Sequence, residues 1–288
     1  MTHRFFIFGY GYTARALVRT LRGDRGWSFA ATTRSQEKVG TMRADGVDPV
    51  IWDDRLDGGA LVGATHILVS TPPDEDGCPS LGAAADVIAP RAGDVQWIGY
   101  LSTNGVYGDH DGAWVDEASE LRGSSARARR RIDAETAWRA FADKVGVPLV
   151  IFRLPGIYGP GRSAIDTVRA GTAKRIVKKG QVFSRMHVDD IAAALARSIE
   201  TPDAGGLFNL SDDEPAPPQD VITYACQLLR IEPPPLVAIE NADLSDMAKS
   251  FYADNKRVSN KRMHDALGVT LKYPSYREGL TAIFESTK

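Results

Sequence analysis

The chain has little cysteine, no long apolar run and no early stretch that resembles a signal peptide. Its two cysteines, Cys78 and Cys226, lie far apart and fit no spacing typical of a metal site or a disulfide framework. A reducing compartment is therefore the simplest setting. Residues 5–8 are apolar, but glycine follows too soon for a signal peptide. No apolar run reaches the roughly 18 residues that cross a bilayer. We therefore expect a cytoplasmic protein without a membrane partner.

The chain also lacks an excess of charge of either sign. Its 35 Lys and Arg residues are set against 37 Asp and Glu residues, for a formal net charge of −2. Without surplus positive charge to neutralise phosphates, a nucleic-acid partner is not expected. Hydrophobic residues make up 43% of the 288 residues, which is ample for a sizeable core. We expect an unidentified small-molecule substrate and leave a homodimer open.

Short apolar runs alternate with helical patterns over the first 155 residues. The runs are continuous rather than alternating, as in strands that are covered on both faces. We expect strands at residues 4–8, 28–33, 47–51, 65–70, 95–101 and 147–153, and helices at about 12–22 and 124–145. This alternation predicts an α/β fold with a doubly wound parallel sheet of the Rossmann type.

Proline and glycine become more frequent after residue 155, and the pattern is less regular. The clearest helices there are expected at about 187–200 and 258–267. We predict a dinucleotide-binding Rossmann domain over residues 1–155 and a smaller C-terminal α/β lobe for the substrate over 156–288. The two are expected to interleave, with residues 187–204 packing back on the first.

A glycine motif lies directly after the first predicted strand and opens the first predicted helix. Its spacing is G-x-G-x-x-A, in which Gly9 allows a tight turn, Gly11 lets the backbone approach a pyrophosphate and Ala14 permits close packing. The helix begins with Tyr12 and Thr13, whose N–H groups would face the phosphates. The motif predicts a dinucleotide site, against the alternative of an ordinary glycine-containing turn.

The end of the second strand indicates which dinucleotide is bound. Residues 31–35 contain no Asp or Glu to accept from a ribose 2′-hydroxyl, but they include Thr33, Arg34 and Ser35. An arginine beside hydroxyl groups suits a 2′-phosphate, so NADP is predicted and NAD is the second choice. The alternative is a solvated arginine at the end of a strand.

Later strand ends supply further candidate cofactor contacts. Asp53 follows the third strand, where it would bond the adenine amino group or simply form a surface turn. The end of the fourth strand should line the cofactor groove by position, with Ser70, Thr71 and Pro72.

Four segments resemble, in order, motifs of the extended short-chain dehydrogenases/reductases, the family of nucleotide-sugar epimerases and dehydratases. They are Leu101-Ser-Thr-Asn-Gly-Val-Tyr-Gly-Asp109, Arg153-Leu-Pro-Gly-Ile-Tyr-Gly-Pro-Gly161, His187-Val-Asp-Asp-Ile191 and Phe208-Asn-Leu210. The resemblance implies a Rossmann fold and a nicotinamide cofactor, bordered by Ser102, Pro155 and Gly156. It places Thr103 where the family has a Ser or Thr that binds the reacting oxygen; a threonine that caps the strand end is the alternative.

The catalytic Tyr-x-x-x-Lys pair of that family is missing. Counting back from Glu135, which resembles the Glu that follows the Lys, puts Arg131 at the Lys position and Arg127 at the Tyr position. Arginine stays protonated and has no acceptor, so Arg127 cannot relay a proton as tyrosine does. Arg131 would still hold the nicotinamide ribose, unless these arginines form only a solvated helix face. The departure resembles an atypical bacterial branch of the superfamily, described as epimerase-like.

Few other residues offer acid–base chemistry. Tyr107 is the nearest candidate in sequence, although its counterpart in the family is mostly structural. His187 resembles a residue that fixes the start of a helix, which favours a structural role.

Arg185 lies two residues before His187, whereas the nucleotide-sugar enzymes have their diphosphate-binding Arg four residues before. This offset argues against a nucleotide-sugar substrate. The acidic loop 109–117 has no ligand spacing, so no metal is expected.

Two functions stay open. The first is an NADP-dependent oxidoreductase or epimerase that acts on a small carbonyl or sugar-like compound, with Thr103, Tyr107 and Arg131 as candidate reacting groups. The second is a non-catalytic NADP(H)-binding redox sensor.

Overall fold

The computed structural model describes residues 3–23, 26–53 and 56–287. The chain forms two compact units, each assembled from several segments. The first unit comprises Met1–Thr103, Arg129–Arg153 and Ala192–Phe208, and the second comprises Asn104–Ala128, Leu154–Ile191 and Asn209–Lys288. The polypeptide therefore passes between the units several times.

The first unit is built on a seven-stranded sheet. The strands follow the order β11-β7-β5-β4-β1-β2-β3, and the pairings of β1 with β2 and β4, of β2 with β3 and of β4 with β5 are parallel. Their bounds are β1 His3–Phe8, β2 Trp27–Thr33, β3 Val47–Ile51, β4 His66–Val69, β5 Trp97–Thr103, β7 Leu149–Leu154 and β11 Leu207–Asn209. The predicted doubly wound α/β fold is confirmed, and all six expected strands are present. The seventh, β11, is too short to show a pattern of its own.

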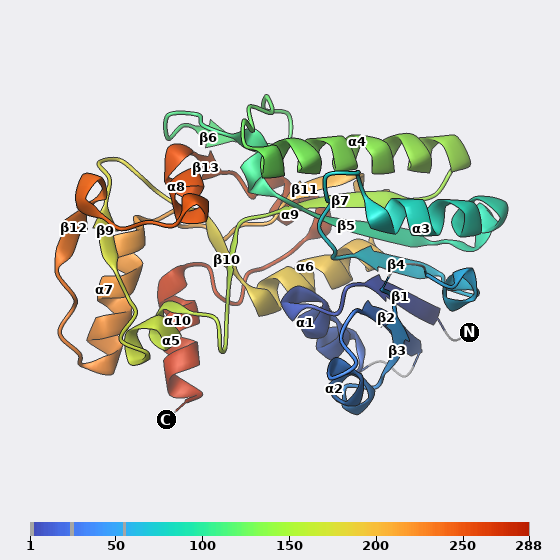
Figure 1. Cartoon of the computed structure of the whole chain (residues 1–288), viewed down its shortest axis with the longest axis horizontal. Coiled ribbons are helices and arrows are strands. Elements are labelled where there is room, and N and C mark those ends of the chain that lie inside the picture. Colours follow the sequence, from blue (N-terminus) through green and yellow to red (C-terminus); the bar gives the residue numbers. More distant parts are fainter. Residues whose placement is uncertain (1–2, 24–25, 54–55, 288) are drawn as a thin grey trace. The chain divides into compact units, whose positions relative to one another are not determined.

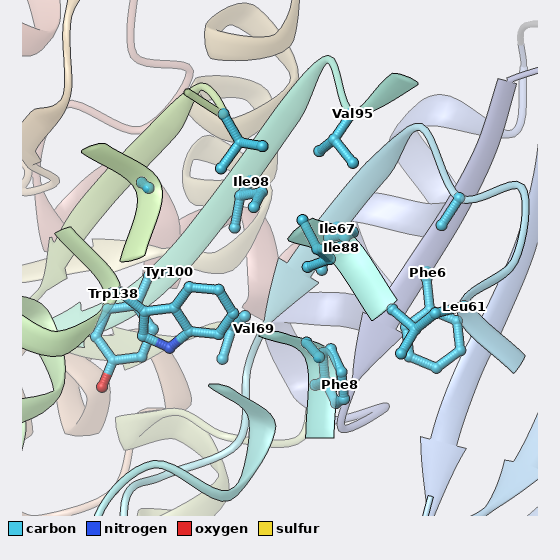
Figure 2. Close-up of a cluster of buried hydrophobic side chains, with 14 of the residues drawn as sticks. Phe6, Phe8, Leu61, Ile67, Val69, Ile88, Val95, Ile98, Tyr100 and Trp138 are labelled. Atoms are coloured by element: carbon cyan, nitrogen blue, oxygen red, sulfur yellow. The ribbon is translucent and has the colours of Figure 1, made fainter. Parts of the chain in front are cut away.

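Helices cover both faces of this sheet (Figure 1). They are α1 Tyr12–Leu21, α2 Lys38–Ala44, α3 Pro79–Ile88, α4 Ala126–Val145 and α6 Val188–Glu200. Side chains of α3 and α4 pack with one sheet face in a single core, where the rings of Tyr100 and Trp138 lie 6.4 Å apart (Figure 2). On the opposite face Trp97 Nε1 donates to Ser198 Oγ of α6 at 3.2 Å.

The strand order sets the position of a binding site. From β1, the chain adds β2 and β3 on one side and then crosses to β4 and β5 on the other. Ligands of open parallel sheets bind at such a switch point, beyond the carboxyl ends of the strands. Here the switch point lies between β1 and β4, which end at Phe8 and Val69.

The second unit has three two-stranded parallel sheets, β10 with β8, β12 with β9 and β13 with β6. Its strands are β6 Trp114–Val115, β8 Gly156–Tyr158, β9 Arg175–Val177, β10 Arg185–His187, β12 Leu236–Ala238 and β13 Arg257–Val258. Its helices are α5 Ala164–Arg169, α7 Pro218–Leu229, α8 Asp246–Ala253, α9 Lys261–Leu267 and α10 Tyr276–Glu285. An apolar core joins α5, α7 and α10.

The four expected helices are all present, whereas α2, α3, α5, α7, α8 and α10 were not predicted. The expected helices at 12–22, 124–145, 187–200 and 258–267 correspond to α1, α4, α6 and α9. Helix α7 was missed because its prolines were interpreted as breaks. Pro218 is the first residue of the helix, where a backbone N–H would have no acceptor within the helix, so proline is tolerated. Across the described residues, every helix is too short or too polar to span a bilayer.

Candidate active site

The glycine motif forms the turn between β1 and α1. Gly9 has φ of +85°, and a Cβ there would lie 2.9 Å from Cγ2 of Thr71, so only glycine suits the position. The Gly9 N–H donates to Oγ1 of Thr32 at 2.8 Å. Sequence reasoning missed this role of Thr32, since nothing in the pattern distinguishes a hydroxyl inside a strand. Gly9 and Thr71 thus bring the ends of β1 and β4 together.

Gly11 lies at the N-terminus of α1, and there is open space where a Cβ atom would lie. The nearest atom to a Cβ built there is Oγ of Ser70, at 4.0 Å. No side chain caps the helix at this end, and Gly11 is exposed, while Thr13 and Ala14 are buried behind it. An uncapped helix N-terminus with space beside its first turn is a site for an anion. The residues present therefore fit the pyrophosphate of a dinucleotide, and Tyr12, half-buried, is the first residue of the helix.

Further predicted cofactor residues follow β4. The Ser70 N–H donates to the carbonyl of Phe8 at 2.9 Å, which extends the pairing of the two central strands. Oγ1 of Thr71 bonds Oγ of Ser80 near the start of α3. Pro72 is exposed. Ser70 and Thr71 thus lie beside the glycine motif, as their position in the sequence predicts.

The end of β2 turns sharply. The Ser35 N–H donates to Oγ1 of Thr33 at 3.1 Å, so these two hydroxyl residues bracket Arg34. The Arg34 side chain is exposed at this turn, and so is Asp53 after β3. The arrangement leaves the guanidinium of Arg34 available to an anionic group.

Arg131 is held against the end of β5. Its Nη1 donates to the Leu101 carbonyl at 2.8 Å and to the Tyr100 hydroxyl at 3.1 Å. Burial raises the pKa of Tyr100 to about 12, so this tyrosine stays protonated at neutral pH. Arg131 therefore does not point freely into solvent, whereas Arg127, one turn earlier, is exposed. Thr103, partly exposed, ends β5 two residues after Leu101.

Ser102 points into the protein and joins a buried ionic network. Its hydroxyl donates to Oε1 of Glu135 at 2.5 Å, and Arg153 Nη2 donates to Oε2 of the same carboxylate at 2.8 Å. All three residues are buried. In the sequence, Glu135 served only to align the motif. Its hydrogen bonds to Ser102 and Arg153, which join α4 to β5 and β7, were not predicted.

The remaining candidates lie in the second unit. The Tyr107 hydroxyl is buried and donates to Oδ1 of Asn209 at 2.7 Å, so it is engaged inside the protein. Pro155 is half-buried and Gly156 is exposed, and the Gly156 N–H donates to the Ser184 carbonyl at 3.2 Å, in the pairing of β8 with β10.

His187 is buried between aromatic rings of the same unit. Its ring centroid lies 4.2 Å from that of Tyr273 and 5.2 Å from that of Tyr158. Burial lowers the pKa of His187 to about 4, so the ring is neutral, and Nδ1 accepts from the Asp189 N–H at 3.2 Å in the first turn of α6. This arrangement fits a histidine that fixes the start of a helix.

Residues 87–211 match the model of the NAD dependent epimerase/dehydratase family. A functionally unknown conserved protein from Silicibacter pomeroyi has a solved structure that is 49% identical, with TM-score 0.92 and full coverage of both chains. A 3-diazoavenalumate denitrifying reductase from a Streptomyces species is 25% identical, over 94% of this chain and 96% of its own. UDP-glucuronic acid 4-epimerase from Bacillus cereus, in complex with NAD, has the same fold: the TM-score is 0.77 at 15% identity, over 98% and 97% of the two chains.

Proposed function

Because residues 87–211 match the model of the NAD dependent epimerase/dehydratase family, we propose that this chain is a member of that family and an NADP-dependent oxidoreductase or epimerase. Its reactant is a small carbonyl or sugar-like compound. The Streptomyces relative is by name a reductase and the Bacillus structure an epimerase, and both names agree with chemistry at a nicotinamide.

One observation carries the cofactor assignment: the open, uncapped start of α1 beside Ser70. Gly9, Gly11 and Ala14 leave room for a pyrophosphate at the switch point of the sheet, and the helix N-terminus supplies N–H groups and partial positive charge. When bound there, a nicotinamide cofactor supplies hydride transfer.

The end of β5 supplies the groups for the reactant. It lies on the same edge of the parallel sheet as the glycine motif, because both follow strand carboxyl ends. The Thr103 hydroxyl would orient the reacting oxygen. Arg131, fixed by Leu101 and Tyr100, places a permanent positive charge beside it and holds the ribose. Since arginine does not give up a proton, water supplies or accepts the proton. Tyr107, whose hydroxyl is engaged by Asn209, takes no part.

The site assignment is tested by Gly11→Val. A branched side chain would occupy the space of the pyrophosphate, and the open surroundings of Gly11 leave the fold unharmed. We expect calorimetry to show no NADP(H) binding by a variant with an unchanged melting temperature. Gly82→Val is the matched control, since Gly82 is exposed on α3 with nothing within 4 Å. Undiminished binding by folded Gly11→Val would overturn the assignment.

Cofactor choice is tested at Arg34. A charge-assisted hydrogen bond contributes roughly 1.5–3 kcal/mol, so NADPH should bind at least about tenfold more tightly than NADH. Arg34→Ala should remove most of this difference by weakening NADPH alone, and rising salt should reduce it. Arg139→Ala, at an exposed arginine of α4, should change neither affinity. Equal wild-type affinities would leave Arg34 as a solvated charge.

Turnover separates the enzyme from the redox sensor. NADPH oxidation with a panel of aldoses, ketoses and hydroxyketones should be measurable and should be lost in Thr103→Val, while cofactor binding persists. Tight NADPH binding with no turnover of any compound, combined with a redox-dependent change in hydrogen exchange, would favour the sensor.

A further inference from the structure

One carboxylate of the second unit is buried and poorly satisfied. Asp212 is 1% exposed, and both of its carboxylate oxygens are enclosed, yet neither makes a hydrogen bond of normal geometry with any described residue. A weak backbone hydrogen bond from Glu214, outside normal geometry, lowers the pKa of Asp212, but burial dominates and raises it to about 8. Such a group is costly to the fold, because each unmet buried polar atom carries a desolvation penalty.

A buried guanidinium lies nearby and is also only partly satisfied. Nη2 of Arg185 donates to the Ala216 carbonyl at 3.2 Å, whereas the enclosed Nη1 has no hydrogen-bond partner in the described chain. Burial lowers the pKa of Arg185, and Asp212 partly offsets that effect, so the two charges influence each other. Within the described residues no ion pair joins them. The Asp212 N–H, however, donates to the Arg185 carbonyl at 2.7 Å, which fixes their backbones side by side.

Rigid elements surround the two groups. The Arg185 guanidinium lies over the ring of Tyr276, 5.5 Å from its centroid. The Tyr158 hydroxyl donates to the Ser275 carbonyl at 3.3 Å, and burial together with the charge of Asp212 raises the pKa of Tyr158. The ring of Tyr276 and the hydroxyl of Tyr158 thus lie close to the two groups.

The next two acidic residues differ from Asp212, because each has a partner for its carboxylate. Asp213 is exposed and accepts from Asn260 Nδ2 at 2.7 Å. Glu214 pairs with Arg277. Three acidic residues thus follow one another, and among the described contacts only the buried one has no hydrogen bond of normal geometry to its carboxylate.

We propose that Asp212 and Arg185 bind a small, uncharged compound with neighbouring hydroxyl groups: one hydroxyl donates to Asp212, and an adjacent oxygen accepts from Nη1 of Arg185. A vicinal diol provides this donor and acceptor in one rigid unit. A phosphate or diphosphate suits the site poorly, since it would lie against the Asp212 carboxyl group and has no pair of adjacent hydroxyl groups.

This inference goes beyond the proposed function and does not rest on it, because binding at Asp212 and Arg185 needs neither cofactor nor turnover. If a probe binds but NADPH is not oxidised, the binding site stands and the proposed enzymatic function fails. If NADPH is oxidised but substitution of Asp212 and Arg185 does not change affinity, the enzymatic function stands and the binding site fails.

The experiment uses the full chain without cofactor and five named probes. Myo-inositol, D-xylose and D-glucose are the neutral probes, and D-glucose 6-phosphate and UDP-glucose are the anionic ones. Saturation-transfer NMR and calorimetry measure binding to the wild type, Asp212→Asn, Arg185→Lys and the control Asp213→Asn. Thermal melting of each variant verifies the fold, and Arg185→Lys keeps the test open if Asp212→Asn does not fold.

We expect at least one neutral probe to bind the wild type and Asp213→Asn equally. Affinity should fall about tenfold in Asp212→Asn, whose amide nitrogen cannot accept a hydrogen bond, and in Arg185→Lys, as when one hydrogen bond is lost. The proposal is overturned if no neutral probe binds, which would leave enclosed water as the occupant. It is equally overturned if only the anionic probes bind, or if the two variants bind as the wild type does.

Discussion

The two units treat buried charge differently. In the first, the buried carboxylate of Glu135 accepts from Ser102 and Arg153, so every charged group of that network has a protein partner. In the second, the Asp212 carboxylate and Nη1 of Arg185 make no hydrogen bond of normal geometry with a described residue. Within the described residues eight buried side-chain nitrogen and oxygen atoms lack a hydrogen-bond partner, and seven of them belong to the second unit.

The contrast distinguishes charges that hold a fold together from charges kept for a ligand. A satisfied network fixes the strands and helices that contribute to it, and removing one member leaves the others unpaired. An unsatisfied buried charge lowers stability and persists where another requirement maintains it. Substitutions in the two units should therefore change stability in opposite directions.

The largest effect is expected when the network of the first unit is broken. Arg153→Met would leave the Glu135 carboxylate buried without its cation, which typically lowers the free energy of unfolding by about 3–5 kcal/mol. Urea unfolding at neutral pH measures the loss. The matched control is Arg197→Ala, which breaks an exposed pair with Glu200 and should change stability by less than about 1 kcal/mol. Similar losses in both variants would contradict the distinction between buried and exposed pairs.

A smaller effect of opposite sign is expected at Asp212. Its folded pKa is about 8, above the ordinary aspartate pKa of 3.8, so between these pH values the folded state holds a proton that the unfolded state has released. Stability therefore falls as pH rises from about 4 to 8, and the full penalty is present above that window. Asp212→Asn should gain about 1–3 kcal/mol over the wild type near pH 9, and much less near pH 5.

The groups that share this environment define the control. Arg185 counteracts the rise in the pKa of Asp212, whereas Asp213 and Glu214 add to it. Asp213→Asn removes an exposed neighbour and should leave the slope of stability against pH almost unchanged. If the free energy of unfolding of the wild type stayed constant from pH 5 to 9, burial would not be what raises the pKa of Asp212.

The sequence predicted the six longer strands and the glycine turn of the first unit, though not α2, α3 or β11, because its strand signals are local. Each strand is a continuous apolar run, and the glycine motif occupies one turn, so six strands and the position of Gly9 and Gly11 followed directly. The second unit depends on contacts distant in sequence. Arg185 and Asp212 meet through the backbone across 27 residues, and no spacing rule connects them. The sequence did single out Arg185, but only by its offset from His187.

Two buried histidines, one in each unit, should make stability depend on pH at the acidic end. Burial lowers the pKa of His66 and of His187 to about 4, from 6.5. Between these values the unfolded chain binds more protons than the folded one, so stability falls as pH drops from about 6.5 to 4. Each histidine should contribute about 2–3 kcal/mol to that loss.

The neighbours of the two rings differ, and this difference makes the prediction specific. His66 lies among aromatic rings beside His3, which lowers its pKa further, whereas the Asp189 carboxylate, 3.7 Å from Nδ1 of His187, partly offsets the effect of burial. Asp189→Asn should therefore lower the pKa of His187, followed by NMR of the ring protons, and leave that of His66 unchanged. His66→Phe, which suits the aromatic surroundings, should remove part of the acid slope of unfolding whether or not Asp189 is present. If both histidines responded to Asp189→Asn, or if His66→Phe left the slope intact, burial would not be what keeps these rings neutral.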